Sequence, residues 1–510
     1  MTHADFAGKR IVILGLARQG TALARFFLQQ GAQVTISDAA PADQLSEPLT
    51  ELAGQPVRLV LGGHPPELLH NCDLLCLSGG VPPQIPLVGE ARRQGIPLSN
   101  DALLTVQRSF AQTLGITGSS GKTTTTTLVG LMLAAENRLA NEQRTVDAPA
   151  ISSSIIPNSS ASVHRSSFTT WVGGNIGIPL IDKLAQMQPN DKIVLELSSF
   201  QLELFNAAAG GASVSPQIAA ILNITPNHLD RHPSMSHYAA AKANILRWQG
   251  ADDIAILGAD DPVTGGWLRS GRVAIAAGNG QAAFSFPLAG RVLGFGLHAA
   301  TGDGCWLSDD QSTLLLRLNG VEQPVLTVND LKVRGRHNLL NVAAACALAA
   351  AAGASPQAMA AAVRTFHGVA HRLELVREWH NVRWYNDSIA TAPERAAAAL
   401  RSFDEPIVLL AGGRDKKLPW NELVQLAQNK VRVIVAFGEA ADLIARAVVE
   451  QSGAAVPVVR AADLPAAVDA AAQAAQPGDV VLLSPGGTSF DAYKDFAARG
   501  EHFRALVQGL

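Results

Sequence analysis

Several features that would place the chain in a specialised class are scarce or missing. Four cysteines in 510 residues exclude a disulfide framework and a zinc-ligand pattern, and they favour a reducing compartment. No stretch reaches about 18 strongly apolar residues, so the sequence predicts no membrane-spanning helix. The polar start, MTHADFAGKR, lacks the apolar core of a signal peptide. A net charge of −3 gives no basic footprint for nucleic acid. We therefore expect a cytoplasmic protein that binds neither membrane nor nucleic acid.

Apolar residues, by contrast, are plentiful. They make up 47% of the chain, against 16% charged residues, which supports buried cores and excludes a wholly disordered chain. The 45 glycines and 27 prolines are too few for a collagen-like or linker-dominated protein. A length of 510 residues exceeds one ordinary domain and favours three.

Short β-branched runs alternate with alanine-rich helical stretches almost throughout. This alternation predicts an α/β protein with parallel sheets covered by helices. Residues 272–334 are richer in short strands and glycine. Strands are predicted at 10–14, 33–37, 74–77, 113–116, 193–197, 218–224, 253–257, 314–318, 407–411, 431–437 and 480–484.

We place domain boundaries near residues 106 and 368, which gives domains at 1–106, 107–368 and 369–510. One segment, about 137–170, has a period of neither about 2 nor about 3.6 residues. Residues 151–170 contain eight serines, so we interpret the segment as an exposed insertion loop. Nothing in the sequence supports a regulatory or partner-binding role for it.

The strongest local motif is Gly115-Ile-Thr-Gly-Ser-Ser-Gly-Lys-Thr-Thr124, between a predicted strand and a predicted helix. Backbone N–H groups in such a turn, together with the helix N-terminus, favour a bound phosphate. In this pattern Lys122 reaches the β- and γ-phosphates and the Thr123 hydroxyl binds Mg²⁺. The usual spacing has glycine where Ile116 stands, so the match is to a shorter form that begins at Gly118. An ordinary strand–turn–helix connection explains Gly-Lys-Thr-Thr poorly, but nucleotide binding alone does not choose a reaction.

A second glycine turn lies near the N-terminus. Residues 11–20, IVILGLARQG, resemble a dinucleotide fingerprint with Ala17 at the middle glycine, and Asp38 stands where a ribose-binding acid would lie. The turn at 78–80 also follows a predicted strand, where ligands of open α/β sheets gather. An oxidoreductase, or a turn that serves only packing, remains an alternative for this region.

Three polar residues stand out after the phosphate-binding turn. Glu196 interrupts an apolar strand, where a carboxylate is costly unless it is paired or binds a metal. Strand-end acids beside such a turn commonly complete a Mg²⁺ site, although a salt bridge at the strand edge is the simpler alternative. His228 follows another strand, and Lys242 lies fourteen residues further along on an alanine-rich helix. Taken singly, His228 and Lys242 would be ordinary surface residues.

Taken in order, these motifs resemble the Mur ligases of peptidoglycan synthesis. The resemblance covers nearly the whole chain outside 137–170. Three stretches, 15–20, 196–202 and 483–500, resemble the member that adds D-glutamate. The matching motifs are Gly118-x-x-Gly121-Lys122-Thr123-Thr124, Gly174-Asn175-Ile-Gly177, Glu196-Leu-Ser198-Ser199-Phe-Gln201, Asn227-His228-Leu-Asp230-Arg231, Lys242, Gly335-Arg-His337-Asn338-Leu-Leu-Asn341, His371-Arg372, Asn386-Asp387-Ser388 and Leu483-Ser484-Pro485.

The resemblance implies a fold and an activity. It implies a Rossmann-like N-terminal domain, a P-loop ATPase-like central domain and a Rossmann-like C-terminal domain, in a monomer. The implied reaction is ATP-dependent ligation of D-glutamate to UDP-N-acetylmuramoyl-L-alanine through an acyl phosphate. Two Mg²⁺ ions are implied as cofactors. Because an ammonium cannot ligate Mg²⁺, the resemblance also implies a CO₂-derived carbamate on Lys242.

The resemblance also assigns roles to individual residues. Catalysis falls to Lys122, His228 and Lys242, and metal binding to Thr123, Glu196, His228 and Lys242 as its carbamate. ATP binding falls to Gly118, Ser119, Ser120, Gly121, Lys122, Thr123, Thr124, Asn338, Asn341, Arg372 and Asp387. The resemblance assigns binding of the UDP substrate to Gly15, Leu16, Ala17, Asp38, Ser78, Gly79, Gly80, Asn175 and Ser198. The incoming amino acid falls to Thr391, Lys416, Ser489 and Phe490.

Three positions depart from the family pattern. Ile389 stands where lysine is usual, Gly79 stands where proline is usual, and Lys417 beside Lys416 leaves that assignment open by one residue. Other interpretations therefore stay open. They are a ligase that adds another amino acid such as L-glutamate or uses a folate acceptor, a nucleotide-binding regulator without catalysis, and a nicotinamide oxidoreductase.

Overall fold

The computed structural model describes residues 6–82, 84–146, 167–175, 177–226, 231–276, 282–298, 302–333, 335–452 and 456–510. The chain divides into two compact units. One comprises Met1–Leu331 with Arg336–Thr365, and the other comprises Lys332–Gly335 with Phe366–Leu510. Each unit is described by itself below, and the domain boundaries near 106 and 368 remain predictions.

The first unit begins with a five-stranded parallel sheet in the order β3-β2-β1-β4-β5. Because the strand order reverses between β1 and β4, the carboxyl ends of these two strands form the crevice where such sheets bind ligands. The strands are β1 (Arg10–Leu14), β2 (Gln33–Asp38), β3 (Val57–Leu61), β4 (Leu74–Leu77) and β5 (Leu98–Ser99). The α-helices are α1 (Arg18–Gln29), α2 (Ser46–Glu51), α3 (Pro86–Arg93) and α4 (Asp101–Arg108).

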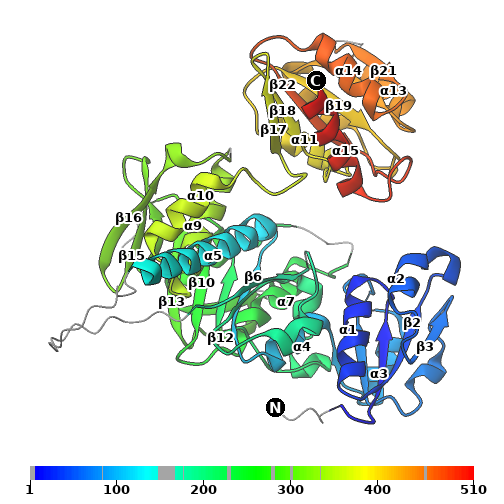
Figure 1. Cartoon of the computed structure of the whole chain (residues 1–510), viewed down its shortest axis with the longest axis vertical. Helices are drawn as coiled ribbons and strands as arrows, with labels where there is room; N and C mark the ends of the chain where they lie inside the picture. Colours follow the sequence, from blue (N-terminus) through cyan, green and yellow to red (C-terminus); the bar gives the residue numbers. More distant parts are fainter. Residues whose placement is uncertain are drawn as a thin grey trace. The chain divides into compact units, whose positions relative to one another are not determined.

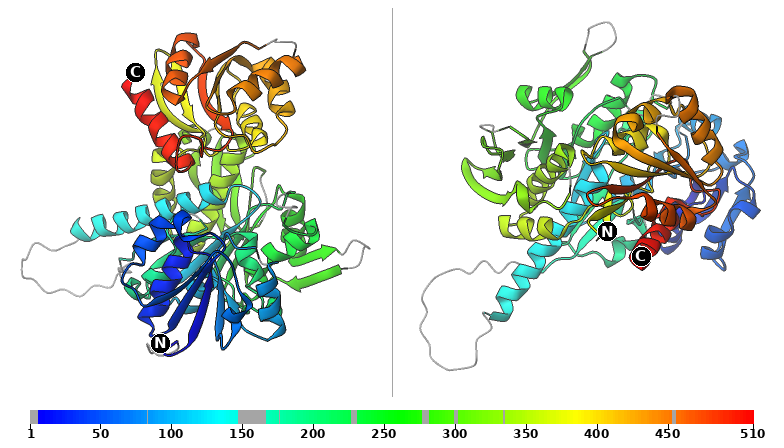
Figure 2. Two further views of the ribbon diagram at one scale, coloured as in Figure 1. Left: turned by 90° about the vertical axis from the view of Figure 1, so that its right-hand side faces the viewer. Right: turned by 90° about the horizontal axis from the view of Figure 1, so that it is seen from above.

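A nine-stranded sheet follows, in the order β16-β15-β14-β13-β10-β9-β6-β8-β7. Every neighbouring pair from β14 to β7 in that order is parallel. The two remaining pairs, β14 with β15 and β15 with β16, are antiparallel. The strands are β6 (Gln112–Thr117), β7 (Thr170–Gly174), β8 (Lys192–Glu196), β9 (Ile218–Ile221), β10 (Ile254–Gly258), β13 (Arg291–Gly296), β14 (Gly304–Leu307), β15 (Thr313–Leu318) and β16 (Val321–Thr327). A separate antiparallel pair joins β11 (Arg272–Ala276) to β12 (Ala282–Pro287), as Figure 2 shows.

Alanine-rich helices cover the nine-stranded sheet. The helix α9 is buried almost all round, because small alanine side chains let α5 and the sheet approach closely. Figure 1 shows α9 and α10 beside α5. The α-helices here are α5 (Lys122–Val146), α6 (Ser199–Glu203), α7 (Met235–Arg247), α8 (Pro262–Ser270), α9 (Arg336–Ala351) and α10 (Pro356–Thr365).

The second unit is built on a six-stranded sheet in the order β17-β18-β22-β19-β20-β21. Only the β17 pairing is antiparallel, and every residue of β19 and β22 is buried. The strands are β17 (Glu374–Trp379), β18 (Val382–Asn386), β19 (Ile407–Gly412), β20 (Val431–Phe437), β21 (Val458–Ala461) and β22 (Val480–Gly486). The helices are α11 (Pro393–Leu400), α12 (Asn421–Lys430), α13 (Ala441–Ser452), α14 (Leu464–Ala474) and α15 (Phe496–Gly509).

The predicted α/β class with helix-covered parallel sheets is confirmed, and a strand is present at each predicted location. One strand is shorter than predicted, because β9 ends at Ile221 and the next residues bind the turn after β6. The predicted loop start at residue 137 is wrong. The helix α5 continues to Val146, since residues 137–142 include good helix formers such as Arg138, Ala140 and Glu142. The rest of that segment, 147–166, lies outside the described residues.

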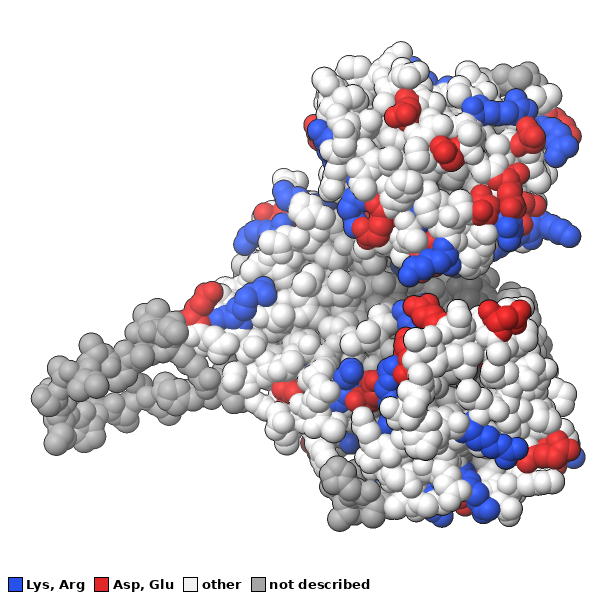
Figure 3. All heavy atoms as spheres, turned by 45° about the vertical axis from the view of Figure 1, so that its right-hand side comes forward, with Lys and Arg blue, Asp and Glu red and all other residues white. Residues whose placement is uncertain are grey.

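Charged side chains of both signs are interspersed on the face of the molecule that Figure 3 presents. This distribution agrees with the small net charge of −3. Among the described helices, none is both long enough and apolar enough to cross a membrane.

Candidate active site

The turn between β6 and α5 is shaped by glycine and closed by a lysine. Gly121 has φ of +82°, and a Cβ there would lie 2.2 Å from Asn341 Oδ1, so only glycine fits. Lys122 Nζ donates to the carbonyl of Gly118 at 2.9 Å, which curls the side chain over the turn. Asn341 Nδ2 donates to Asn338 Oδ1 at 3.3 Å. The start of α9 therefore lies against the turn that the sequence predicts for phosphate.

Side chains from neighbouring strands and helices hold the same turn in place. The Tyr238 hydroxyl donates to Ser119 Oγ at 3.1 Å, and Ser119 Oγ donates to the Thr225 carbonyl at 2.9 Å. The Ser120 N–H donates to Asn223 Oδ1 at 2.9 Å. The sequence motif did not reveal Tyr238, Asn223 or Thr225, because these contacts join segments more than a hundred residues apart.

A buried carboxylate lies beside the first turn of α5. Glu196, at the end of β8, is 2% exposed. Its Oε2 accepts from Thr123 Oγ1 at 2.9 Å, and its Oε1 accepts from Asn175 Nδ2 at 2.9 Å. The structure thus brings three predicted residues together: two neutral donors, Thr123 and Asn175, and one charged acceptor, Glu196. Such a set of oxygens, with the Glu196 carboxylate buried, fits a hard divalent cation.

Lys242, on α7, is 1% exposed and lies under the same turn. Its Nζ donates to the Gly118 carbonyl at 2.9 Å and to Thr117 Oγ1 at 3.3 Å. Burial holds the pKa of this amine well below its ordinary value, Lys122 lowers the pKa further, and Glu196 opposes the shift. Burial of this kind favours the uncharged form of a lysine amine.

The predicted ligand His228 lies outside the described residues, so its position relative to Lys242 stays a prediction. Among the described residues, a different cluster offers three possible metal-binding side chains, Glu203, His232 and His237, with donor atoms within 4.8 Å of one another. A hydrogen bond of 2.9 Å joins His232 Nε2 and Ser199 Oγ, and His232 Nδ1 lies 3.5 Å from Glu203. Arg92 and Arg231 act on the Glu203 carboxylate, so the one acid of this cluster already lies near two cations.

The N-terminal crevice brings together the two glycine turns. Gly15 has φ of +93°, and a Cβ there would lie 2.8 Å from the Ser78 Cβ. Ser78 Oγ donates to the Gly15 carbonyl at 3.1 Å, and the Leu16 N–H donates to Asp38 Oδ2 at 2.6 Å. Asp38 therefore braces the loop that Leu16 and Ala17 form. The Gly79 N–H donates to Gln19 Oε1 at 2.5 Å, and Gln19 is a contact that the sequence analysis missed.

A capping motif joins this N-terminal part to the segment that follows Glu196. Ser198 caps α6 reciprocally with Gln201. Asn100 Nδ2 donates to the Gln201 carbonyl at 3.0 Å, and Gln201 Nε2 lies 3.4 Å from Asp101 Oδ1. Burial raises the pKa of the Asp101 carboxyl to about 6, against the Gln201 hydrogen bond. Gln201 was noted only as part of a motif, and its contacts position Ser198 next to the strand that carries Glu196.

In the second unit, a buried acid lies at the end of β18. Burial raises the pKa of Asp387 to about 7, while the Ser484 hydroxyl, the Leu373 N–H, Arg372 and Arg395 act in the opposite direction. Ser484 Oγ donates to Asp387 Oδ2 at 2.8 Å. Arg372 and Asp387, both predicted for ATP, are therefore neighbours.

The predicted amino-acid residues lie at the carboxyl ends of three neighbouring strands of the same sheet. Lys416, in the loop after β19, donates to Thr391 Oγ1 at 3.2 Å. Ser489, in the loop after β22, is buried, and Phe490 is 60% exposed. Lys417 has φ of +59°, and its N–H donates to Asp415. The direct contact with Thr391 favours Lys416 over Lys417.

A buried arginine ties these loops together. Arg499, on α15, is 0% exposed. Its guanidinium donates to Ser388 Oγ and to the carbonyls of Ser388, Gly487 and Thr488, at 2.9 to 3.3 Å. Burial lowers the pKa of Arg499 to about 10. The arginine fixes the loop of Thr391 to the loop of Ser489.

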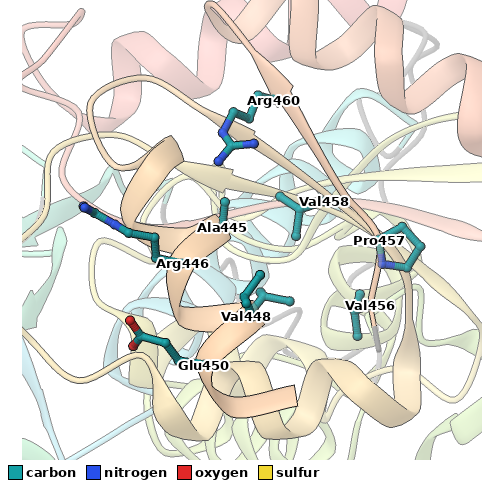
Figure 4. A pocket seen from close by; sticks show the side chains of 9 residues that line it. Ala445, Arg446, Val448, Glu450, Val456, Pro457, Val458 and Arg460 are labelled. Carbon is teal, nitrogen blue, oxygen red and sulfur yellow. The ribbon is translucent and has the colours of Figure 1, made fainter. Parts of the chain in front are cut away.

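Two hollows lie away from these residues. One, of about 390 Å³, is lined in the second unit by α13 and β21, with Arg446, Glu450 and Arg460 among apolar side chains (Figure 4). The other, of about 420 Å³, lies at the amino ends of β1 and β2 and includes Arg10, Arg58 and Cys72. Neither hollow contains a predicted site residue.

A phosphate-type turn with a buried lysine and carboxylate, carried on one of several parallel sheets, defines the class: a multidomain nucleotide-binding α/β protein. Three family descriptions match the chain. They are the Mur ligase MurD-like N-terminal domain over residues 9–100, the Mur ligase middle domain over 116–349 and the Mur ligase glutamate ligase domain over 371–487. The chain belongs to the Mur ligase family, and its predicted three-domain organisation is confirmed.

Curated relatives are similar over their full length. A UDP-N-acetylmuramoylalanine–D-glutamate ligase of Symbiobacterium thermophilum is 38% identical, covering 98% of this chain and 98% of that protein. An enzyme of the same name from Pelotomaculum thermopropionicum is 36% identical, covering 99% of each. Among solved structures, the UDP-N-acetylmuramate-alanine ligase of Thermotoga maritima has a TM-score of 0.54 at 19% identity, covering 98% of this chain and 99% of that one. At that identity, the structural likeness shows the fold alone.

Proposed function

We propose that this chain is an ATP-dependent ligase that joins D-glutamate to UDP-N-acetylmuramoyl-L-alanine, in peptidoglycan precursor synthesis. The observation that carries the proposal is the cluster of Lys122, Thr123, Glu196 and Lys242 around one glycine turn. Relatives that carry this name at 36–38% identity, over nearly the whole chain, support the choice of substrates. We also propose that the protein is a cytoplasmic monomer.

The chemistry requires neutralisation of like charges. A carboxylate does not react with an amine at neutral pH, because oxide is a poor leaving group. Transfer of the γ-phosphate of ATP to that carboxylate makes an acyl phosphate, from which phosphate leaves readily. The attacking carboxylate and the phosphate are both anions. Lys122, the turn amides at 118–121 and the start of α5 neutralise and orient them. The amine of the amino acid then displaces phosphate and forms the amide.

Thr123 and Glu196 would hold one Mg²⁺, with Asn175 orienting the carboxylate, and His228 and Lys242 would serve a second. The ions would supply positive charge to the transferred phosphoryl group. Burial lowers the pKa of Lys242 and so favours the uncharged amine, the form in which Nζ would attack the carbon of CO₂. This step forms an N–C bond, releases one proton, and leaves an anionic carbamate that can ligate a cation.

The remaining predicted residues divide between two binding regions. The UDP part would bind at the N-terminal crevice, where Gly15, Leu16, Ala17 and the 78–80 turn meet. Asn338 and Asn341 would lie on the adenine side of ATP, and Arg372 and Asp387 would contact ATP. The amino acid would bind to Thr391, Lys416, Ser489 and Phe490, where a lysine and hydroxyl groups suit carboxylates.

The test is phosphate release from ATP with each substrate omitted in turn. We expect release only when UDP-N-acetylmuramoyl-L-alanine and D-glutamate are both present, together with a product heavier by one glutamate residue. Lys122→Ala should lower the rate by about a hundredfold or more. Unchanged product yield in that variant would refute the proposal.

Two acceptor controls separate the alternatives. Release with L-glutamate but not with D-glutamate, or with a folate acceptor, would identify a related ligase instead. ATP binding without release under any acceptor would indicate a regulator.

A further inference from the structure

The loops at the carboxyl ends of β18, β19 and β22 carry two cations, and the charge of one affects the pKa of the other. Lys416 belongs to the loop after β19, and Arg395 belongs to the first turn of α11, which follows β18. The loops are joined directly, since the Gly486 N–H at the end of β22 donates to the Ala390 carbonyl at 2.9 Å. These loops therefore form one edge of the sheet, where ligands of such folds bind.

Arg395 is held near Lys416 by its helix. Its backbone N–H donates to the Ala392 carbonyl at 3.0 Å, which places it one turn from Thr391, the hydrogen-bond partner of Lys416. The charge of Arg395 lowers the pKa of Lys416, in addition to the larger lowering by burial. The two cations thus repel each other across this loop edge.

No acid among the described residues forms an ion pair with Arg395 or Lys416. The side chain of Arg395 is exposed, and it makes no ion pair or hydrogen bond with any described residue. The one hydrogen bond of the Lys416 ammonium goes to a neutral hydroxyl. The charge of Arg395 acts on the buried carboxyl of Asp387, which Ser484 holds and whose pKa burial raises to about 7, so this acid carries only part of a charge at neutral pH. Ile389, between Asp387 and Thr391, adds no charge.

Two adjacent cations without a counterion suit a ligand that brings two negative charges. A dicarboxylic amino acid does so, and a guanidinium can bind one carboxylate through two parallel hydrogen bonds while an ammonium binds the other. A neutral or monocarboxylic amino acid would leave one cation unpaired.

We propose that Arg395 binds one carboxylate of the incoming amino acid while Lys416 binds the other, and that this pair selects a dicarboxylic substrate. The inference rests on the proposed function, and it adds a specificity-determining residue to the four predicted for that site. Neither cation binds the amine of the amino acid, so the amine remains available to attack the acyl phosphate.

The experiment compares Arg395→Ala and Arg395→Lys with a matched control. Arg446→Ala removes an equally exposed arginine of the same unit, on α13. We expect Arg395→Ala to raise the KM for D-glutamate by about 10- to 30-fold, with the KM for ATP and the Tm unchanged. Arg395→Lys should recover part of the loss, and Arg446→Ala should match the parent protein. Titration calorimetry with glutarate, a dicarboxylate without an amine, should show the same order of affinities.

The outcomes distinguish this inference from the proposed function. If the parent protein uses D-glutamate and Arg395→Ala changes its KM by less than twofold, the inference is overturned. Equal increases in the KM for ATP and for D-glutamate, or a lower Tm, would also overturn it, because they indicate a structural role. If the parent protein turns over no D-glutamate yet binds glutarate, and Arg395→Ala abolishes that binding, the cation pair stands and the proposed function falls.

Discussion

Individual buried charges concentrate the chemistry of this chain at a few atoms. Glu196 and Lys242 are each nearly inaccessible, and desolvation of such groups costs several kcal/mol unless partners compensate. Neutral donors hold Glu196, and burial lowers the pKa of Lys242. A pair tuned in this way is typical of a site that binds a cation, because the ion restores the missing charge.

Lys242→Ala should lower the ligation rate by about a hundredfold or more, because the site loses the anion that a carbamate would supply. Added acetate or formate should restore part of the rate, since a small carboxylate can enter the space that the side chain vacates. The measurement is phosphate release at increasing carboxylate concentration. Lys192→Ala, at the opposite end of β8, is the control and should respond to neither change. Absence of rescue, together with unmodified Lys242 by mass in active enzyme, would contradict the carbamate.

Asp387 predicts a pH dependence of stability. Its pKa is raised by burial to about 7 in the folded protein, against about 4 when unfolded. The folded state therefore binds the proton more tightly, and stability falls as pH rises from about 4 through about 7. Asp387→Asn removes this effect, so between pH 5 and pH 8 the variant should gain about 2.6 kcal/mol relative to the parent. Urea unfolding of the second unit at both pH values measures the difference, and parallel pH profiles would refute the assignment.

At the scale of elements, the turn from β6 into α5 is a tightly constrained connection. Its glycine, its lysine and its contacts with α7 and α9 all depend on close backbone approach. Helix α6 also depends on contacts with other segments, since a five-residue helix is too short to be stable alone. Its cap and its contacts with Asn100 stabilise it.

Gly121→Ala and Gly271→Ala form a matched pair that tests this constraint. Both glycines have positive φ, but a Cβ at Gly121 would strike Asn341, whereas none of the described atoms lies within 4 Å of a Cβ at Gly271. We expect Gly271→Ala to cost about 1 kcal/mol of stability, with ATP affinity unchanged. Gly121→Ala should weaken ATP binding by tenfold or more, because the turn and the start of α9 must shift. Equal ATP affinities in a titration would contradict this account.

At the scale of the whole molecule, the two compact units have separate cores. Calorimetry should therefore resolve two unfolding transitions rather than one. A non-hydrolysable ATP analogue at about 100 times its Kd should stabilise the unit that contains Lys122 by about 2.7 kcal/mol. In Lys122→Ala the shift should shrink. A single transition in the parent protein, at every ligand concentration, would show that the units unfold as one.

The sequence alone predicted much of this architecture. Alternating apolar strands and alanine-rich helices determine parallel, helix-covered sheets, and the motif around Lys122 determines a phosphate-type turn, because both depend on spacing within a few residues. The end of α5 was misjudged at residue 137 for the same reason. A solvated helix needs no apolar period, so a pattern based on burial does not detect it.

Only the tertiary structure decided which distant side chains meet. Asn175 on Glu196, Tyr238 on Ser119 and Arg499 on the loops of Ser388 and Gly487 join segments from 12 to 119 residues apart. Burial likewise became known only from the fold, and burial moves the pKa of Lys242 and of Asp387. Short-range order follows from local side-chain chemistry, whereas desolvation and long-range hydrogen bonds arise only when packing excludes water between remote segments.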